Sequence, residues 1–386
     1  MSSFSSIINK AKKDWNCPNL MNGASADLGP KIAFSSPLMN YATYGGIPRA
    51  RITEFFGFPG GGKSTTTVDI CKNACLLFQD EYAAQVLDLQ EKISSGNKGL
   101  VTELEELQER GPKKVLYVDL EHAFDGKWSR TIGLDATEIE LMQPPDEPAE
   151  HILQVILELI QSGETGMVVL DSIPSLTTEA ELNKKLGERT VASLAGLMTV
   201  FLRKVVPLLT RYDCTLILIN QVRVNMDNPY VVNTPGGEAV KFYSSLRMQF
   251  KIGAPVDFVG TELPSNAENP AGYIINVKLV KQKSAPFDRK NASYHLMSKS
   301  GIRVDMDIAD LAVKKYGIIK KTGAWYTVCD PETGEVLNNE AGNPVKLNGM
   351  PKVLDYLQLN QEYFKKVTKF ILDDIAGNSD DESSEE

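Results

Sequence analysis

Apolar and polar positions along the middle of the chain follow a pattern typical of strands separated by helices. Four short runs are rich in apolar and β-forming residues, as buried strands are: residues 52–56, 114–118, 167–170 and 215–219. Apolar side chains recur at helical spacing in residues 64–77, 152–160 and 194–209, the last with a bend or an end expected near Pro207. This alternation predicts an α/β fold with a mostly parallel central sheet covered by helices on both faces.

A further helical segment is expected between the first two strands. Two sets of apolar residues each share a helical face: Val86, Leu89 and Ile93, then Leu100, Leu104 and Leu107. Small and polar residues at 94–99 separate the two sets. We therefore expect an inserted helical hairpin at about residues 79–110, ended by Gly111-Pro112.

The two ends of the chain differ from this central region. Five apolar residues near the N-terminus share one helical face: Phe4, Ile7, Ile8, Ala11 and Trp15. A helix there could pack on the core or bind a neighbouring subunit, and the sequence favours neither. Residues 272–280 alternate apolar and polar side chains, which indicates an antiparallel extension of the sheet. From about residue 305 the pattern turns helical, with one small hairpin that turns at residues 330–334.

These patterns divide the chain into four parts. Residues 1–31 would form an N-terminal helix and a linker, and residues 32–304 a core that carries the inserted hairpin. Residues 305–375 would form a small α/β C-terminal domain, followed by a disordered acidic tail at 376–386.

The first strand and the first helix are joined by Gly57-Phe-Pro-Gly-Gly-Gly-Lys63-Ser64, which has the G-x-x-x-x-G-K-[ST] spacing of a phosphate-binding loop. Glycines let successive backbone N–H groups surround a polyphosphate at the start of a helix. Lys63 adds a positive charge, and Ser64 a hydroxyl ligand for Mg²⁺. A glycine-rich turn before an ordinary helix is the alternative, but it leaves the Lys-Ser pair unexplained. The predicted contacts are Gly57, Phe58, Pro59, Gly60, Gly61, Gly62, Lys63 and Ser64.

Three polar side chains follow the ends of later strands, where ligands bind in parallel sheets. Asp171 is the candidate for positioning Mg²⁺ and water, although an Asp there could also cap a turn. Glu121 is the candidate for activating the attacking water. Gln221 could sense a terminal phosphate, and a buried structural amide is the competing interpretation.

Two polar segments beside these residues suggest a nucleic-acid site. Residues 223–235 form a long polar segment that ends before Gly236 and Gly237, and residues 179–192 carry three basic residues, Lys184, Lys185 and Arg189. Basic and apolar side chains on such loops suit single-stranded nucleic acid. Two ordinary surface loops are the alternative, and for either segment alone that alternative would be preferred.

Composition places few limits on these predictions. The net charge is −9, but seven acidic and no basic residues follow residue 372, so the rest of the chain carries only −2. That distribution weakens the argument against a nucleic-acid partner. The five cysteines form no C-x-x-C pair and fit reduced thiols of the cytoplasm. The sequence has neither a long apolar run nor a signal peptide, so we expect no membrane partner.

Six motifs resemble those of the bacterial RecA family of recombinases in order and spacing: Glu121-His-Ala-Phe-Asp125, Val169-Leu-Asp-Ser172, Leu218-Ile-Asn-Gln-Val-Arg223, Gly236-Gly-Glu-Ala-Val-Lys-Phe-Tyr243, Val280-Lys-Gln-Lys-Ser-Ala-Pro-Phe287 and Gly323-Ala-Trp-Tyr326. The resemblance implies a RecA-type ATPase core that uses ATP and Mg²⁺. It implies a helical filament on single-stranded DNA, with ATP between subunits, that catalyses pairing and strand exchange with duplex DNA in recombination and repair. A single-strand-binding protein and loader proteins are the implied accessory partners.

The resemblance also implies a role for each matching residue. The nucleotide contacts would include Lys63, Ser64 and Thr65, with Asp125 and Trp128 at the adenine. Glu121 would be the catalytic base and Gln221 the γ-phosphate sensor, and Lys281 and Lys283 would reach the ATP of the neighbouring subunit. The implied subunit-interface residues are Lys241, Phe242 and Arg247.

The two polar segments correspond to the family's DNA-binding loops. The implied contacts to the DNA backbone are Arg203, Arg223, Gly236 and Gly237. Val191 and Met226 fall where apolar side chains enter between base triplets.

The sequence departs from the family pattern in several places. The glycine loop lacks the usual Pro-Glu-Ser-Ser-Gly sequence, the hairpin is additional, Asn225 replaces a usual Lys, and the N-terminal segment does not match the polymerisation helix. These departures suggest a phage-encoded relative. Two alternatives remain. One is a hexameric helicase motor, which lacks the signature at 236–243. The other is a mediator that holds ATP without hydrolysing it, against which the presence of four residues argues: Glu121, Asp171, Lys281 and Lys283.

Overall fold

The computed structural model describes residues 6, 10, 31–185, 193–224 and 232–377. All elements discussed below lie in the compact unit Lys31–Glu386. Several predictions fall outside the described residues: those for the helix at 4–15, Arg189, Val191, Met226 and the acidic tail.

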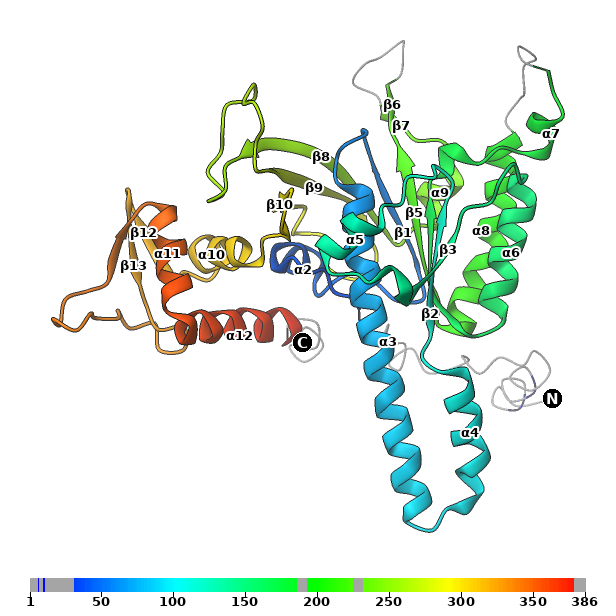
Figure 1. Ribbon diagram of the computed structural model, residues 1–386, viewed down its shortest axis with the longest axis horizontal. Coiled ribbons are helices and arrows are strands. Elements are labelled where there is room, and N and C mark those ends of the chain that lie inside the picture. Colours follow the sequence, from blue (N-terminus) through cyan, green and yellow to red (C-terminus); the bar gives the residue numbers. More distant parts are fainter. Residues whose placement is uncertain (1–5, 7–9, 11–30, 186–192, 225–231, 378–386) are drawn as a thin grey trace. The chain divides into compact units, whose positions relative to one another are not determined.

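Nine strands of the described chain form one sheet in the order β11-β10-β9-β8-β1-β5-β4-β2-β3 (Figure 1). Six neighbouring strands pair in parallel: β8 (Leu246–Val256), β1 (Ile52–Gly57), β5 (Thr215–Gln221), β4 (Thr165–Asp171), β2 (Lys114–Asp119) and β3 (Ile139–Met142). The antiparallel strands are β9 (Gly272–Gln282), β10 (Asn291–Met297) and β11 (Gly301–Ile302). The predicted mostly parallel sheet with an antiparallel extension is therefore confirmed.

Helices cover both faces of the parallel strands. The helices α6 (Ala149–Gln161) and α8 (Ser193–Tyr212) lie together on one face (Figure 1), and their apolar residues share a core with Leu116 and Val118 of β2. The alternating residues Val115 and Tyr117 pack instead with α3 (Lys63–Ser94). Because successive strand residues point to opposite faces, these two cores lie on the two sides of the sheet.

Of the bend or end expected near Pro207, only the end is wrong, because α8 continues past this residue to Tyr212. Proline removes one backbone hydrogen bond within a helix. Leu202, Val205 and Leu209 all remain buried in the core beneath α8. Tertiary packing therefore outweighs the local preference at this position.

The additional helical segment begins as a continuation of the loop helix. The helix α3 runs unbroken for 32 residues, because its sequence contains neither glycine nor proline, and α4 (Val101–Arg110) returns after the turn near Gly96. In Figure 1 the two helices extend away from the sheet together. The first arm of the expected hairpin is therefore the distal part of α3 rather than a separate helix.

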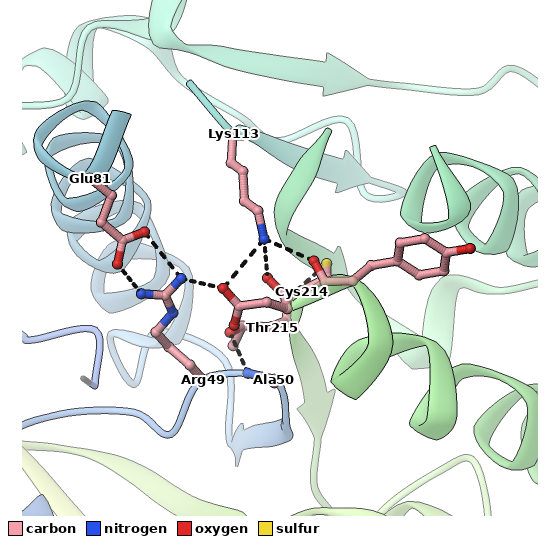
Figure 2. A network of polar contacts seen from close by, with 8 residues as sticks. Arg49, Ala50, Glu81, Lys113, Cys214 and Thr215 are labelled. Carbon is pink, nitrogen blue, oxygen red and sulfur yellow. Dashed lines mark hydrogen bonds and ion pairs between the residues drawn. The ribbon is translucent and has the colours of Figure 1, made fainter. Parts of the chain in front are cut away.

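A network of charged side chains fixes the middle of α3 to the base of the sheet (Figure 2). Arg49, whose side chain is 7% exposed, forms ion pairs with Glu81 of α3 and with Asp213, which precedes β5. Lys113 directly precedes β2, and its ammonium donates to the carbonyl oxygens of Tyr212 and Asp213 at 2.8 and 2.9 Å. The helix that begins at the glycine loop is thus tied to the starts of two central strands.

The C-terminal region has its own small core. Its helices are α10 (Val304–Lys314), α11 (Met350–Leu359) and α12 (Gln361–Gly377), and its antiparallel strands are β12 (Ile319–Thr322), β13 (Trp325–Val328) and β14 (Lys346–Asn348). Ile319 and Tyr326 are buried with apolar residues of the three helices. The expected turn at 330–334 is present, with the Gly334 N–H donating to the Asp330 carbonyl at 2.9 Å. The region also contains a three-stranded sheet, β12-β13-β14, where only one hairpin was expected. The strand β14 could not be predicted, because it has three residues and is too short and polar to give a strand pattern.

Candidate active site

The glycine loop joins β1 to α3 at the carboxyl edge of the parallel strands. Gly62 has φ of +87°, and a side-chain carbon on Gly57 would lie 2.2 Å from the carbonyl oxygen of Phe250. A residue with a side chain is therefore strained at either position. The ammonium of Lys63, the first residue of α3, donates to the carbonyl oxygens of Gly57 and Phe58 at 3.1 and 2.9 Å. The loop has the tight turn and the helix N-terminus that suit a polyphosphate.

Ser64 and Asp171, 107 positions apart in the sequence, meet beside this loop. The Ser64 hydroxyl donates to Oδ2 of Asp171 at 3.0 Å, and the Tyr117 hydroxyl donates to the same oxygen at 2.7 Å. Burial raises the pKa of the Asp171 carboxyl, while the hydrogen bonds from Tyr117 and Ser64 act in the opposite direction. Burial raises the pKa of Tyr117 and lowers that of Lys63.

The two side chains Ser64 and Asp171 fit a Mg²⁺ ion, which prefers hard oxygen ligands and keeps several of its waters. Within the described residues, no three His, Cys, Asp or Glu side chains lie close enough to hold a metal ion by themselves. A magnesium site here would therefore combine these two protein oxygens with water and nucleotide oxygens.

Glu121 and Gln221 are joined directly at the carboxyl ends of two strands. Gln221 is the last residue of β5, and its Nε2 donates to Oε1 of Glu121 at 2.9 Å. The hydroxyl of Ser172, which follows β4, donates to the same oxygen at 2.5 Å. Since β4 lies between β2 and β5, the strand order brings these three side chains together. Their roles in a reaction stay predictions.

Lys281 and Lys283 both reach the end of the short helix α9 (Glu238–Tyr243). The Lys281 ammonium donates to the carbonyl oxygens of Lys241 and Phe242 at 2.6 and 2.8 Å, and that of Lys283 donates to Phe242 at 3.5 Å. Burial, then the charges of Lys283 and Arg247, lower the pKa of Lys281 to about 8. Phe242 is 70% exposed, which leaves this residue open to a partner.

Arg247 is buried within this chain. Its Nε donates to Oε2 of Glu54 in β1, and its guanidinium lies 4.7 Å from the centre of the Phe56 ring. Oε1 of Glu54 accepts a hydrogen bond from Nδ2 of Asn220 at 3.0 Å, and the same nitrogen donates to the carbonyl of Pro235 at 3.0 Å. The network therefore connects three central strands to the end of the segment at 223–235.

Asp125 precedes the helix α5 (Gly126–Ile132), and Trp128 lies in its first turn. The Asp125 carboxylate caps this helix by accepting from the N–H of Lys127 at 2.7 Å. The Trp128 indole N–H donates to the hydroxyl of Thr65 in α3 at 3.1 Å. The indole is therefore held against the first turn of the loop helix, near the predicted phosphate contacts.

The described residues of the two polar segments project from the same end of the sheet (Figure 1), as shown by α7 (Glu179–Leu182), β6 (Arg223–Val224) and β7 (Val232–Asn233). Four predicted DNA contacts are exposed there or on α8: Lys184, Lys185, Arg203 and Arg223. Gly236 and Gly237 have φ of +87° and +80°, and a side-chain carbon on either would lie 3.0 Å from a neighbouring side chain. Both positions therefore require glycine.

Sequence reasoning missed four residues that organise this site: Glu54, Tyr117, Ser172 and Asn220. Ser172 and Asn220 directly adjoin predicted residues, so their position after a strand could have identified them. Glu54 is a charged residue in a run expected to be buried, which signals a buried partner. Tyr117 gave no signal, because a tyrosine in a buried strand is ordinary core.

No helix in the described part of the chain is long and apolar enough to cross a membrane.

Comparison with known proteins agrees with the motifs and the fold. The RecA N-terminal domain family matches residues 83–303, more than half of the chain, a range that contains Glu121, Asp171, Gln221, Lys281 and Lys283. Protein RecA of Thermus aquaticus is 30% identical over 334 residues, which cover 85% of this chain and 80% of that protein. Protein RecA of Borrelia duttonii is 30% identical over 378 residues, covering 95% and 88%, and that of Chlorobaculum tepidum is 31% identical over 311 residues, covering 80% and 77%. The chain therefore belongs to the RecA family of recombinases.

Proposed function

We propose that the protein is an ATP-dependent recombinase that forms helical filaments on single-stranded DNA and catalyses homologous pairing and strand exchange with duplex DNA in recombination and repair. The observation that carries the proposal is the pairing of Ser64 with Asp171 beside a direct contact between Glu121 and Gln221. A phosphate loop, a magnesium carboxylate, a base and a sensor are the parts that ATP hydrolysis requires.

Each residue at the nucleotide site has a defined task in this proposal. The ammonium of Lys63 leaves its two carbonyl partners for the β- and γ-phosphates. Ser64 and Asp171 hold Mg²⁺, which when bound neutralises phosphate charge. Glu121 takes a proton from the attacking water. Trp128 and Asp125 lie at the adenine, where an indole stacks well on a base.

Gln221 connects hydrolysis to DNA binding in the proposal. Its amide hydrogen-bonds to Glu121 in the described conformation, and the amide of a γ-phosphate sensor must leave that partner when nucleotide binds. Gln221 is followed by the segment at 223–235, and Asn220 holds the end of that segment. A shift of these side chains would therefore reach the DNA-binding segment directly.

The neighbouring subunit completes the site in the proposed filament. Two ammonium groups side by side, Lys281 and Lys283, are costly without an anion between them, and the neighbour's ATP would supply that anion. Lys241, Phe242 and Arg247 would lie at or behind this interface. We further propose a cytoplasmic location, with a single-strand-binding protein and a loader as accessory partners.

Electron microscopy with single-stranded DNA and a slowly hydrolysed ATP analogue tests the proposal. We expect extended helical filaments that require both DNA and nucleotide, together with strand exchange when ATP and homologous duplex are supplied. Closed rings that unwind duplex in one direction would instead indicate a helicase.

A mixing experiment tests whether the site is shared between subunits. Lys63→Ala alone and Lys281→Ala with Lys283→Ala should each abolish DNA-stimulated ATP hydrolysis. When the two variants are mixed, interfaces that join an intact Lys63 to an intact lysine pair should restore part of the activity. Full hydrolysis by the double-lysine variant alone would contradict the shared site.

A further inference from the structure

Tyr117 is a buried side chain at the site to which the proposed reaction assigns no task. Its hydroxyl donates to Oδ2 of Asp171 at 2.7 Å, and the residue is only 2% exposed. Its ring packs edge-on against the ring of Phe124, with centroids 5.3 Å apart. The hydroxyl is therefore a donor in a fixed position rather than a mobile surface group.

The strand pairing determines where this donor lies. β2 and β4 are parallel neighbours in which Tyr117 pairs with Val169 and Asp119 with Asp171. The Tyr117 side chain therefore reaches forward along the neighbouring strand to the carboxylate at its end. The terminal torsion of an aspartate side chain has a broad distribution, so packing alone defines the orientation of the Asp171 carboxylate only weakly. The fixed Tyr117 hydroxyl, which donates to one carboxylate oxygen, restricts that orientation.

We propose that Tyr117 is a positioning residue whose hydroxyl holds the Asp171 carboxylate facing Ser64 and thereby sets how tightly Mg²⁺ binds together with nucleotide. The proposal rests on the proposed nucleotide site. It assigns Tyr117 no contact with substrate, so its effect should appear in the magnesium requirement rather than in the rate at saturating magnesium.

Tyr117→Phe removes the hydroxyl and keeps the ring. Binding of a fluorescent ATP analogue is measured as Mg²⁺ is titrated, without DNA and without turnover. We expect the Mg²⁺ concentration at half-saturation to rise at least about tenfold, as the loss of one hydrogen bond to a charged group implies. Analogue affinity in excess chelator should stay unchanged, and hydrolysis at saturating Mg²⁺ should approach that of the parent.

Tyr294→Phe is the matched control. Tyr294 is also fully buried, and its hydroxyl lies 2.5 Å from that of Thr66 in α3, so this variant also loses one buried hydrogen bond near the loop helix. It should leave the magnesium requirement unchanged. Asp171→Asn provides a second test, because Tyr117→Phe added to it should shift the magnesium requirement no further.

The outcomes separate this inference from the proposed function. A parent protein whose nucleotide binding ignores Mg²⁺ would contradict the proposed site itself. A parent that requires Mg²⁺, with identical curves for Tyr117→Phe and the parent, would overturn the role of Tyr117 alone. An equal shift in Tyr294→Phe, or a further shift in the Asp171→Asn background, would show that Tyr117 acts through general packing.

Discussion

The buried ion pair between Glu54 and Arg247 makes a prediction about stability that can be worked out from the structure. Glu54 is completely buried in β1 and Arg247 is 8% exposed in β8. Glu54→Gln keeps the shape of the side chain and an acceptor for Asn220, but it leaves the guanidinium buried without an opposite charge. Breaking a buried pair in this way costs about 3–5 kcal/mol.

The Phe56 ring sets the expected value within that range. It lies 4.7 Å from the Arg247 guanidinium and stabilises a buried cation by about 1–2 kcal/mol whether or not the carboxylate is present. We therefore expect Glu54→Gln to lower the free energy of unfolding by about 3 kcal/mol. Arg247→Met added to Glu54→Gln removes the unpaired charge and should recover part of this loss.

Urea unfolding followed by circular dichroism gives these differences, with Glu164→Gln as the matched control. Glu164, which directly precedes β4, pairs with Lys114 of β2 at 3.7 Å, but both side chains are about half exposed. Its loss should cost at most about 0.5 kcal/mol and less in high salt. Equal costs for Glu54→Gln and Glu164→Gln, or a double variant less stable than Glu54→Gln alone, would refute the electrostatic reasoning.

Three further predictions follow from the charged network and the site. Arg49→Met should lower the free energy of unfolding by about 2 kcal/mol, because it removes charged hydrogen bonds to Glu81 and Asp213, whose carboxylates remain partly hydrated; the urea midpoint measures this. Filament assembly from free subunits should weaken as pH rises through about 8, where Lys281 loses its proton, and Lys281→Arg should extend assembly to higher pH in a light-scattering assay. Gly236→Ala should cost at least about 1 kcal/mol, since its backbone is left-handed, and a thermal melt without this loss would contradict the conformation.

The sequence predicts the parallel core well, because the apolar runs of the strands, the glycine loop and the polar residues at the strand ends are all local patterns. The loop at Gly57–Ser64 and the residues Glu121, Asp171 and Gln221 follow from position after a strand. Their meeting at one edge follows from the general rule for parallel sheets. The direct contact between Gln221 and Glu121 could not be predicted in this way, because it depends on β4 lying between the strands that carry them.

Other features depend on partners far away in the sequence. Glu54 and Arg247 are 193 positions apart, so only the adjacency of β1 and β8 shows that each charge is paired. The continuity of α3 was missed because the polar run Gln79-Asp-Glu81 looks like a break, whereas Arg49 pairs with Glu81 and holds the helix at that level. Tyr117 looks like core until its hydroxyl is placed beside Asp171.

The central claim, that Glu121 is the base of a DNA-stimulated ATPase, is tested most directly by measuring phosphate release with and without single-stranded DNA. Single-stranded DNA should increase the rate at which the parent protein releases phosphate. Glu121→Gln should bind a fluorescent ATP analogue as the parent does yet release phosphate at least about 100-fold more slowly. Glu140→Gln, an exposed carboxyl on the neighbouring β3, should behave like the parent. DNA-stimulated phosphate release by Glu121→Gln at the parent rate would contradict the account.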